Sequence, residues 1–129
     1  MNAYEFTDFL LTEYGKRTGK EISGTQSGNL KDYAYGGFSA GQLESPLTKK
    51  IAARILHEFM LRIMGLKDLD WGDAVNLKDI YDCRVCANSV AQVVSRGLMK
   101  ESRPSIFGMD EVLGDGVCQK IVDRLIVIE

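Results

Sequence analysis

The segment from Ser45 to Gly65 constrains the fold of this chain more than any other part of the sequence. Its apolar side chains recur at helical spacing and form one stripe: Leu47, Ile51, Ile55, Leu56, Phe59, Met60 and Ile63. Such a stripe predicts an amphipathic helix that buries one face. Ser45 followed by Pro46 is typical of a helix start, and Gly65 is typical of a stop. We therefore expect a long helix over residues 45–64.

Three further segments show the same periodicity and are predicted to be helices: residues 4–17, 83–96 and 116–126. Asp82 and Asp115 are the expected caps of the last two. The segments between the helices are rich in glycine or acidic residues and are expected to be loops: 18–45, 66–78 and 97–108. Strand signals are few, although the β-branched tail at 125–128 could be extended. The sequence thus predicts an all-α fold with four main helices and long loops.

Composition limits the function classes. The chain has 129 residues, which fits a single domain over 1–129. With 16 Lys plus Arg and 18 Asp plus Glu, the formal net charge is −2, which excludes a strongly basic nucleic-acid binder. No apolar run approaches the roughly 18 to 20 residues of a membrane span. We expect neither a nucleic-acid partner nor insertion into a membrane.

The first nine residues have no basic region and carry Glu5 and Asp8. This pattern is not that of a secretory signal peptide. The chain as it stands is therefore expected in the cytoplasm, or in the cell envelope if a signal has been removed.

The three cysteines are Cys83, Cys86 and Cys118, and an odd number makes a poor disulfide framework. We expect reduced thiols that pack in a helical core. An alternative is a tetrahedral zinc site formed by these cysteines and His57. Structural zinc usually shows two local ligand pairs, and only one Cys-x-x-Cys pair is present, so no metal or cofactor is expected. A thioredoxin-like role would need a strand before the pair.

His57 is the only histidine and lies near the edge of the apolar stripe. Any Ser-His-Asp or Cys-His arrangement would have to use it, but no nucleophile motif accompanies it. The glycine-rich segment 36–41 lacks the Gly-Lys-Ser/Thr of a phosphate-binding loop. The sequence therefore predicts a protein that is not an enzyme.

Two halves of the chain share a pattern in which an aromatic loop residue precedes an amphipathic helix by about ten residues. The first half contains Gly37-Phe38 followed by Leu47-Thr48-Lys49-Lys50-Ile51-Ala52-Ala53. The second contains Leu77-Lys78-Asp79-Ile80, Cys86-Ala87-Asn88-Ser89-Val90-Ala91, Gly97-Leu98-Met99 and Phe107. In these motifs the chain resembles the S-layer homology family, with about two repeats.

The resemblance implies a helix–loop–helix unit used twice, with unit one at about 3–65 and unit two at about 77–127. It also implies a binding module for an anionic cell-wall glycan or a protein partner. The family's Thr-Arg-x-Glu helix start, whose arginine can pair with an anionic polymer, keeps Thr48 but has Lys49 and Ile51 in the other places. Gly114, Asp115 and Val117 stand at the corresponding places of unit two.

The resemblance points to Thr48, Lys49, Lys50 and Arg54 as the residues that would contact a ligand through charge and helix-terminal amides. The departures from the family motif leave a second interpretation. The chain could be a cytoplasmic interaction protein, of the immunity or adaptor type, that keeps the fold but not the binding of wall polymer.

Overall fold

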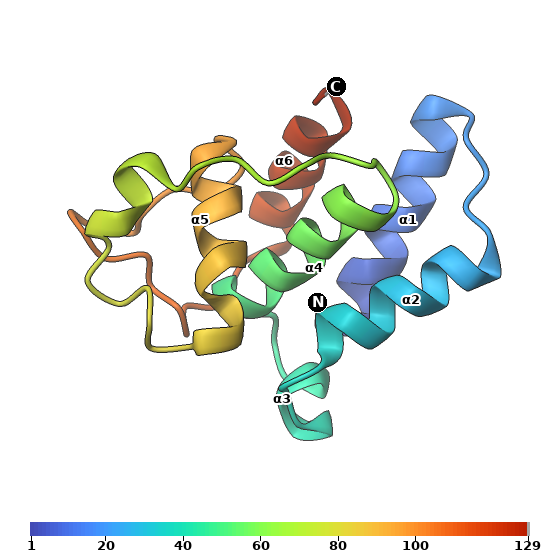
Figure 1. Ribbon diagram of the computed structural model, residues 1–129. Coiled ribbons are helices and arrows are strands. Elements are labelled where there is room, and N and C mark those ends of the chain that lie inside the picture. The colour runs from blue at the N-terminus through green and yellow to red at the C-terminus, as the bar shows by residue number, and fades with distance from the viewer. Residues whose placement is uncertain (129) are drawn as a thin grey trace.

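The structure is a computed structural model that describes residues 1–128 (Figure 1). In chain order its helices are α1 (Ala3–Thr18), α2 (Gly24–Tyr35), α3 (Ala40–Glu44), α4 (Lys49–Arg62), the 3-10 helices η1 (Gly72–Asn76) and η2 (Arg84–Cys86), α5 (Ala87–Ser95) and α6 (Asp115–Ile126). Within residues 1–128 there is no strand, only two isolated β-bridges. The all-α prediction is confirmed. No described helix combines the length and apolar character needed to cross a membrane.

Helix α4 lies at the centre of the molecule, as its apolar stripe predicts (Figure 1). It packs most extensively against α2 on one side and α5 on the other, and it also contacts α1. Ten of its fourteen residues are buried, among them Ile51, Ile55 and Phe59. Helix α6 closes the core against α1. One apolar cluster therefore joins the first and last helices of the chain.

The glycine-rich segment expected to be a loop instead contains α2 and α3, so the prediction of four main helices is wrong. Both helices begin with a capping box, in which a serine caps the helix and a glutamine three residues later bonds back to it. Ser23 pairs with Gln26 in this way, and Ser39 pairs with Gln42. Of the glycines of α2, Gly24 is exposed and Gly28 is half-buried, while Leu30 is fully buried. Capping and one-sided burial outweigh the low helix propensity of glycine here.

The central helix also begins later than expected. Ser45 is the C-cap of α3, and Thr48 is the N-cap of α4. Pro46 and Leu47 lie between them and are not helical, because the backbone of Leu47 bonds to distant segments. The amide of Leu47 donates to the carbonyl of Met1, and the carbonyl of Leu47 accepts from the amide of Leu113. These long-range bonds were not visible in the local pattern of Ser45 and Pro46.

The segments that lead into α4 and α6 run antiparallel to each other. Thr48 and Val112 form a β-bridge, flanked by bonds from the amide of Lys49 to the carbonyl of Glu111 and from the amide of Leu113 to the carbonyl of Leu47. Each segment then turns into a helix, at Thr48 and at Gly114 respectively. The starts of these two helices are thereby held side by side.

The helix expected at 83–96 is divided. Residues Arg84–Cys86 form η2, and α5 begins only at Ala87. Asp82 does not cap it, since Cys83 and Cys86 hold the cap positions. The first and last predicted helices agree closely with α1 and α6, and the doubtful tail remains helical as far as Ile126.

Candidate functional site

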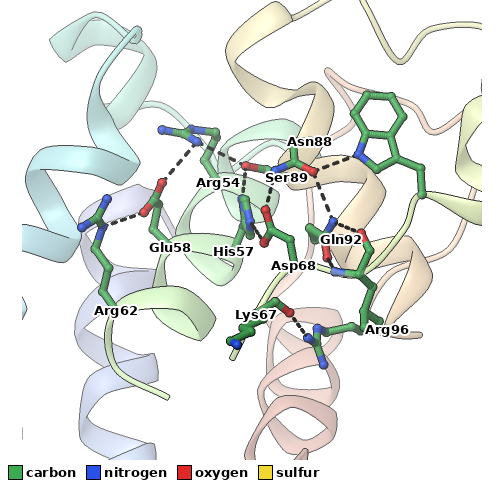
Figure 2. Close-up of polar contacts among 12 residues, drawn as sticks. Arg54, His57, Glu58, Arg62, Lys67, Asp68, Asn88, Ser89, Gln92 and Arg96 are labelled. Atoms are coloured by element: carbon green, nitrogen blue, oxygen red, sulfur yellow. Dashed lines mark hydrogen bonds and ion pairs between the residues drawn. The ribbon is translucent and has the colours of Figure 1, made fainter. Parts of the chain in front are cut away.

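A group of polar side chains joins α4 to α5 and to the connector between them (Figure 2). We call it the polar seam, and its members are Arg54, His57, Glu58 and Arg62 of α4, Asp68 of the connector, and Asn88, Ser89 and Gln92 of α5. Four of these eight residues are buried, namely His57, Glu58, Ser89 and Gln92. Buried polar groups need partners, so the seam is the first place to look for chemistry.

His57 lies between a serine and an aspartate. Its Nδ1 is 2.9 Å from Ser89 Oγ and its Nε2 is 2.7 Å from Asp68 Oδ1 (Figure 2). A carboxylate only accepts, so Nε2 carries the proton and donates to Asp68. In the neutral ring Nδ1 is then an acceptor, and the Ser89 hydroxyl donates to it. The prediction of a boundary histidine is wrong, since His57 is only 5% exposed.

The order Ser89–His57–Asp68 has the connectivity of a hydrolase triad. A nucleophile must meet a substrate, however, and Ser89 has no exposed surface. Its Oγ also lies 3.3 Å from Arg54 Nη1, which donates to it. The seam therefore holds Ser89 as a buried hydrogen-bonding link between α4 and α5.

Asp68 anchors the connector to α5. Burial alone would raise the pKa of its carboxyl, but hydrogen bonds from Asn88 and His57 outweigh burial and hold the pKa below its usual value. Asn88 donates to Asp68 at 2.8 Å and accepts from Trp71 Nε1 at 2.9 Å. Gln92 adds a two-way bond to the backbone of Leu69, both distances being 2.8 Å. The connector is thus ordered by side chains of one helix face.

The other end of the seam reaches α2. Glu58 accepts from Arg62 Nε at 2.8 Å and lies 3.5 Å from Arg54 Nη1. Arg54 Nη2 also donates to the carbonyl of Tyr33, and the Arg62 guanidinium lies 3.3 Å from the centre of the Tyr33 ring. Burial lowers the pKa of Arg54, Glu58 opposes this, and Arg62 adds to it. Both guanidinium groups are therefore engaged in contacts within the chain, with Glu58 and with Tyr33.

The four predicted ligand-binding residues do not form one open surface. Thr48 caps α4 without a side-chain bond, and its Oγ1 is buried and unpartnered within residues 1–128. Lys49 is buried, and its Nζ donates to the carbonyls of Lys100 and Phe107 and lies over the Phe107 ring. Lys50 Nζ pairs with Asp110 at 2.6 Å, and Arg54 belongs to the polar seam.

A second polar anchor, which the sequence did not reveal, holds the loop before α6. The Asp79 carboxylate accepts from the amides of Phe107 and Gly108, both at 2.9 Å. Burial opposes ionisation of Asp79, but these backbone bonds outweigh it and hold its pKa below the usual value. Burial lowers the pKa of Lys49, against the attraction of Glu111 and Asp79. In the peptide group between Phe107 and Gly108, the N–H is thus bonded to Asp79 and the C=O to Lys49.

The cysteines are arranged differently from the prediction of three reduced thiols. Cys83 and Cys86 form a disulfide, and Cys118 is a buried free thiol. The expectation of core packing holds for Cys86 and Cys118, both fully enclosed. In residues 1–128 no group of three or more His, Cys, Asp or Glu side chains is placed to hold a metal ion. The alternative zinc set of Cys83, Cys86, Cys118 and His57 is therefore not assembled.

An opening lies beside the start of α6, with a cavity volume of about 430 Å³. One wall is the segment 98–102 and the other is 111–114. Val117 and Ile121 of α6 add apolar surface. Charges of both signs line the same opening, from Lys100, Arg124, Glu101 and Glu111. We call this opening the α6 groove. An opening of this volume suits a short peptide segment of a partner better than the flat surface of a folded protein.

Comparison of the chain with protein-family models, with curated proteins and with solved structures finds no match.

Proposed function

We propose that this chain is a non-enzymatic binding module that holds an extended segment of a protein partner in the α6 groove. The observation that carries the proposal is an unpaired backbone edge at Val112, beside a groove lined by both apolar and charged side chains. Lys49, Lys50 and Arg54 are bonded within the chain, and the Thr48 hydroxyl is buried. The groove is the place where backbone and side-chain groups remain free for a ligand.

The geometry of the bridge explains why Val112 is free. Because the bonds run between the neighbours of Thr48 and Val112, the N–H and C=O of Val112 itself point away from the bridge. Neither group has a hydrogen-bond partner within residues 1–128. The Val112 side chain is 61% exposed. An extended peptide could add to this edge through main-chain bonds and place alternate side chains in the groove.

The pairing of the two helix starts also supports the proposal of two related units. Leu47 and Leu113 are joined by a backbone bond, and each is followed by the N-cap of a helix. When the two units are aligned at Leu47 and Leu113, Thr48 corresponds to Gly114 and Lys49 corresponds to Asp115. A degenerate pair of S-layer homology repeats is consistent with it.

A protein partner is favoured over an anionic cell-wall glycan. A polyanion would need free cations at the start of α4. Lys49, Lys50 and Arg54 are instead bonded to a carbonyl pair, to Asp110 and to the polar seam. Because these three cations are bonded within the chain, they also support the second candidate function. This is a cytoplasmic interaction protein that keeps the fold but not the binding of wall polymer.

A photo-crosslinking amino acid at position 112 tests the proposal, with extracts of the cells that make the protein and purified wall polysaccharide as separate probes. We expect an identified protein to be crosslinked through one short segment. Val112→Lys should then lower its affinity about tenfold or more, the range of an interface anchor. Val75→Lys is the matched control, because Val75 is 59% exposed but lies in η1.

Two results would overturn the proposal. One is sedimentation with the wall polysaccharide without any crosslink to protein. The other is an equal loss of partner binding in Val112→Lys and Val75→Lys, because the groove would then have no special part in binding.

A further inference from the structure

The disulfide between Cys83 and Cys86 lies outside the polar seam and the α6 groove. It joins the two ends of a four-residue segment, and α5 begins at the next residue, Ala87. Cys86 is fully enclosed, whereas Cys83 is partly exposed. The two sulfurs of one bond therefore differ in access to solvent.

A purely stabilising role explains this bond poorly. A disulfide stabilises a fold mainly by restricting the unfolded chain, and the effect is smallest for short loops. Only Arg84 and Val85 lie between the cysteines, and a backbone bond from the amide of Cys86 to the carbonyl of Cys83 already closes the same turn. The position of the bond is better explained by exchange chemistry.

We propose that Cys83 and Cys86 form a reversible dithiol–disulfide site that exchanges with low-molecular-weight thiols such as glutathione. In this site Cys83 is the sulfur that is attacked, and Cys86 is the enclosed leaving and resolving sulfur. The proposal is independent of the α6 groove.

The exchange takes place in two steps. A glutathione thiolate attacks Cys83 Sγ, forming a mixed disulfide, while the Cys83–Cys86 bond breaks and its electron pair stays on Cys86 as a thiolate. A second glutathione thiolate attacks the glutathione sulfur of the mixed disulfide and releases Cys83 as a thiolate. Both cysteine thiolates take up protons. The protein gains two electrons, and two glutathione molecules become one oxidised glutathione.

The start of α5 favours this direction of attack. Cys86 is the N-cap of the nine-residue helix, and no side chain caps that end. The positive end of a helix dipole stabilises a thiolate next to it, although the amide of Ala87 already donates to the carbonyl of Arg84. The leaving sulfur is thus placed where its negative charge is stabilised, and the attacked sulfur is placed where a small thiol can reach it.

The site is also joined to the rest of the fold through Val85. A Cβ at Gly37 would lie 3.2 Å from Val85 Cγ2, so η2 packs closely on the turn between α2 and α3. Opening the disulfide removes the covalent link that holds this segment. We expect faster amide hydrogen exchange at 84–88 and near Gly37 in the reduced protein, with α6 unchanged.

The test uses the full chain in glutathione buffers of graded reduced-to-oxidised ratio at pH 7. After acid quench, labelling with a maleimide in denaturant at neutral pH and mass measurement should show two thiols that appear and disappear together, beside a constant label on Cys118. Cys118 is an internal control, because it is enclosed and burial raises the pKa of its thiol. In a parallel sample labelled in the native state, without quench or denaturant, it should remain unlabelled.

Single variants test the assigned roles. Cys86→Ser should trap glutathione on Cys83, whereas Cys83→Ser should give about tenfold less adduct on the enclosed Cys86. A disulfide that opens only in denaturant would overturn the proposal, as would a pair that stays reduced in every buffer. Equal adducts in the two variants would overturn the assignment of Cys83 as the attacked sulfur. The wild-type titration decides reversibility even if a variant folds poorly.

Discussion

Replacing Asp79 by asparagine tests how the loop before α6 is held. The Asp79 carboxylate accepts two backbone amides, from Phe107 and Gly108. Asparagine has one acceptor oxygen, and its NH₂ group would face the second amide. Hydrogen bonds to a charged group contribute roughly 1.5–3 kcal/mol each. Because Asp79 is only partly buried, we expect the variant to lose about 2 kcal/mol of unfolding free energy.

Asp110→Asn is the matched control. Asp110 pairs with Lys50 at 2.6 Å, but its side chain is 80% exposed. Exposed ion pairs contribute about 0.5 kcal/mol or less. In urea titrations followed by circular dichroism, Asp79→Asn should shift the midpoint by about 1 M, and Asp110→Asn by at most about a quarter of that.

The pH dependence separates charge from packing at Asp79. Its pKa in the folded protein lies below the ordinary value of 3.8, so between the two values the unfolded chain binds more protons. The stabilisation is therefore fully present above the ordinary value and is lost as the pH falls through the lower one. The difference between wild type and Asp79→Asn should narrow on acidification. Asp68 titrates in both proteins and cancels in this difference.

Two outcomes would refute this account of Asp79. In the first, Asp79→Asn costs no more than Asp110→Asn. In the second, its deficit is the same at pH 7 and at the most acidic pH where both proteins still fold. Either would show that the backbone amides of Phe107 and Gly108 do not depend on the charge of Asp79.

Three further predictions concern stability and reactivity. Gly28→Ala should stabilise the protein by about 0.5–1 kcal/mol, because Gly28 lies within α2 with nothing within 4 Å of an added Cβ; a lower melting temperature would contradict this. Gly108→Ala should destabilise it by more than about 1 kcal/mol in the same melts, since φ is +87° and the new Cβ would meet Glu111. Ser89→Ala should lower the free energy of unfolding by about 1–3 kcal/mol, because His57 Nδ1 loses its hydrogen-bond partner. In the native wild-type protein a fluorophosphonate probe should not label Ser89, because this residue is fully buried.

Local patterns predicted much of the helical framework and missed what depends on capping or distant contacts. The periodicity of α1 and α6 was enough to place both helices, and the stripe of α4 correctly indicated the core. The glycines of 24–35 disfavour a helix by local rules, whereas the capping box at Ser23 and the burial of Leu30 stabilise α2. The start of α4 depends on backbone bonds from Leu47 to Met1 and Leu113, which no local rule contains.

The candidate site was less predictable, since its partners are far apart in sequence. His57 and Ser89 are 32 residues apart, and Lys49 and Phe107 are 58 apart. Helical spacing can place such residues on a face, but it does not identify the segment that covers the face. Polar residues within an amphipathic helix could therefore be listed as candidates, whereas their burial could only come from tertiary structure.

The pairing of the two helix starts explains why corresponding positions behave differently. Lys49 and Asp115 are each the first residue after an N-cap. The amide of Lys49 bonds to the carbonyl of Glu111, and the loop held by Asp79 covers its side chain, so Lys49 bonds to that loop instead of facing solvent. The Asp115 side chain is instead 74% exposed and pairs with the amino group of Met1 at 2.8 Å. The fold thus uses the cation at the first position of α4 internally, and the same pairing leaves the N–H and C=O of Val112 without a hydrogen-bond partner within residues 1–128.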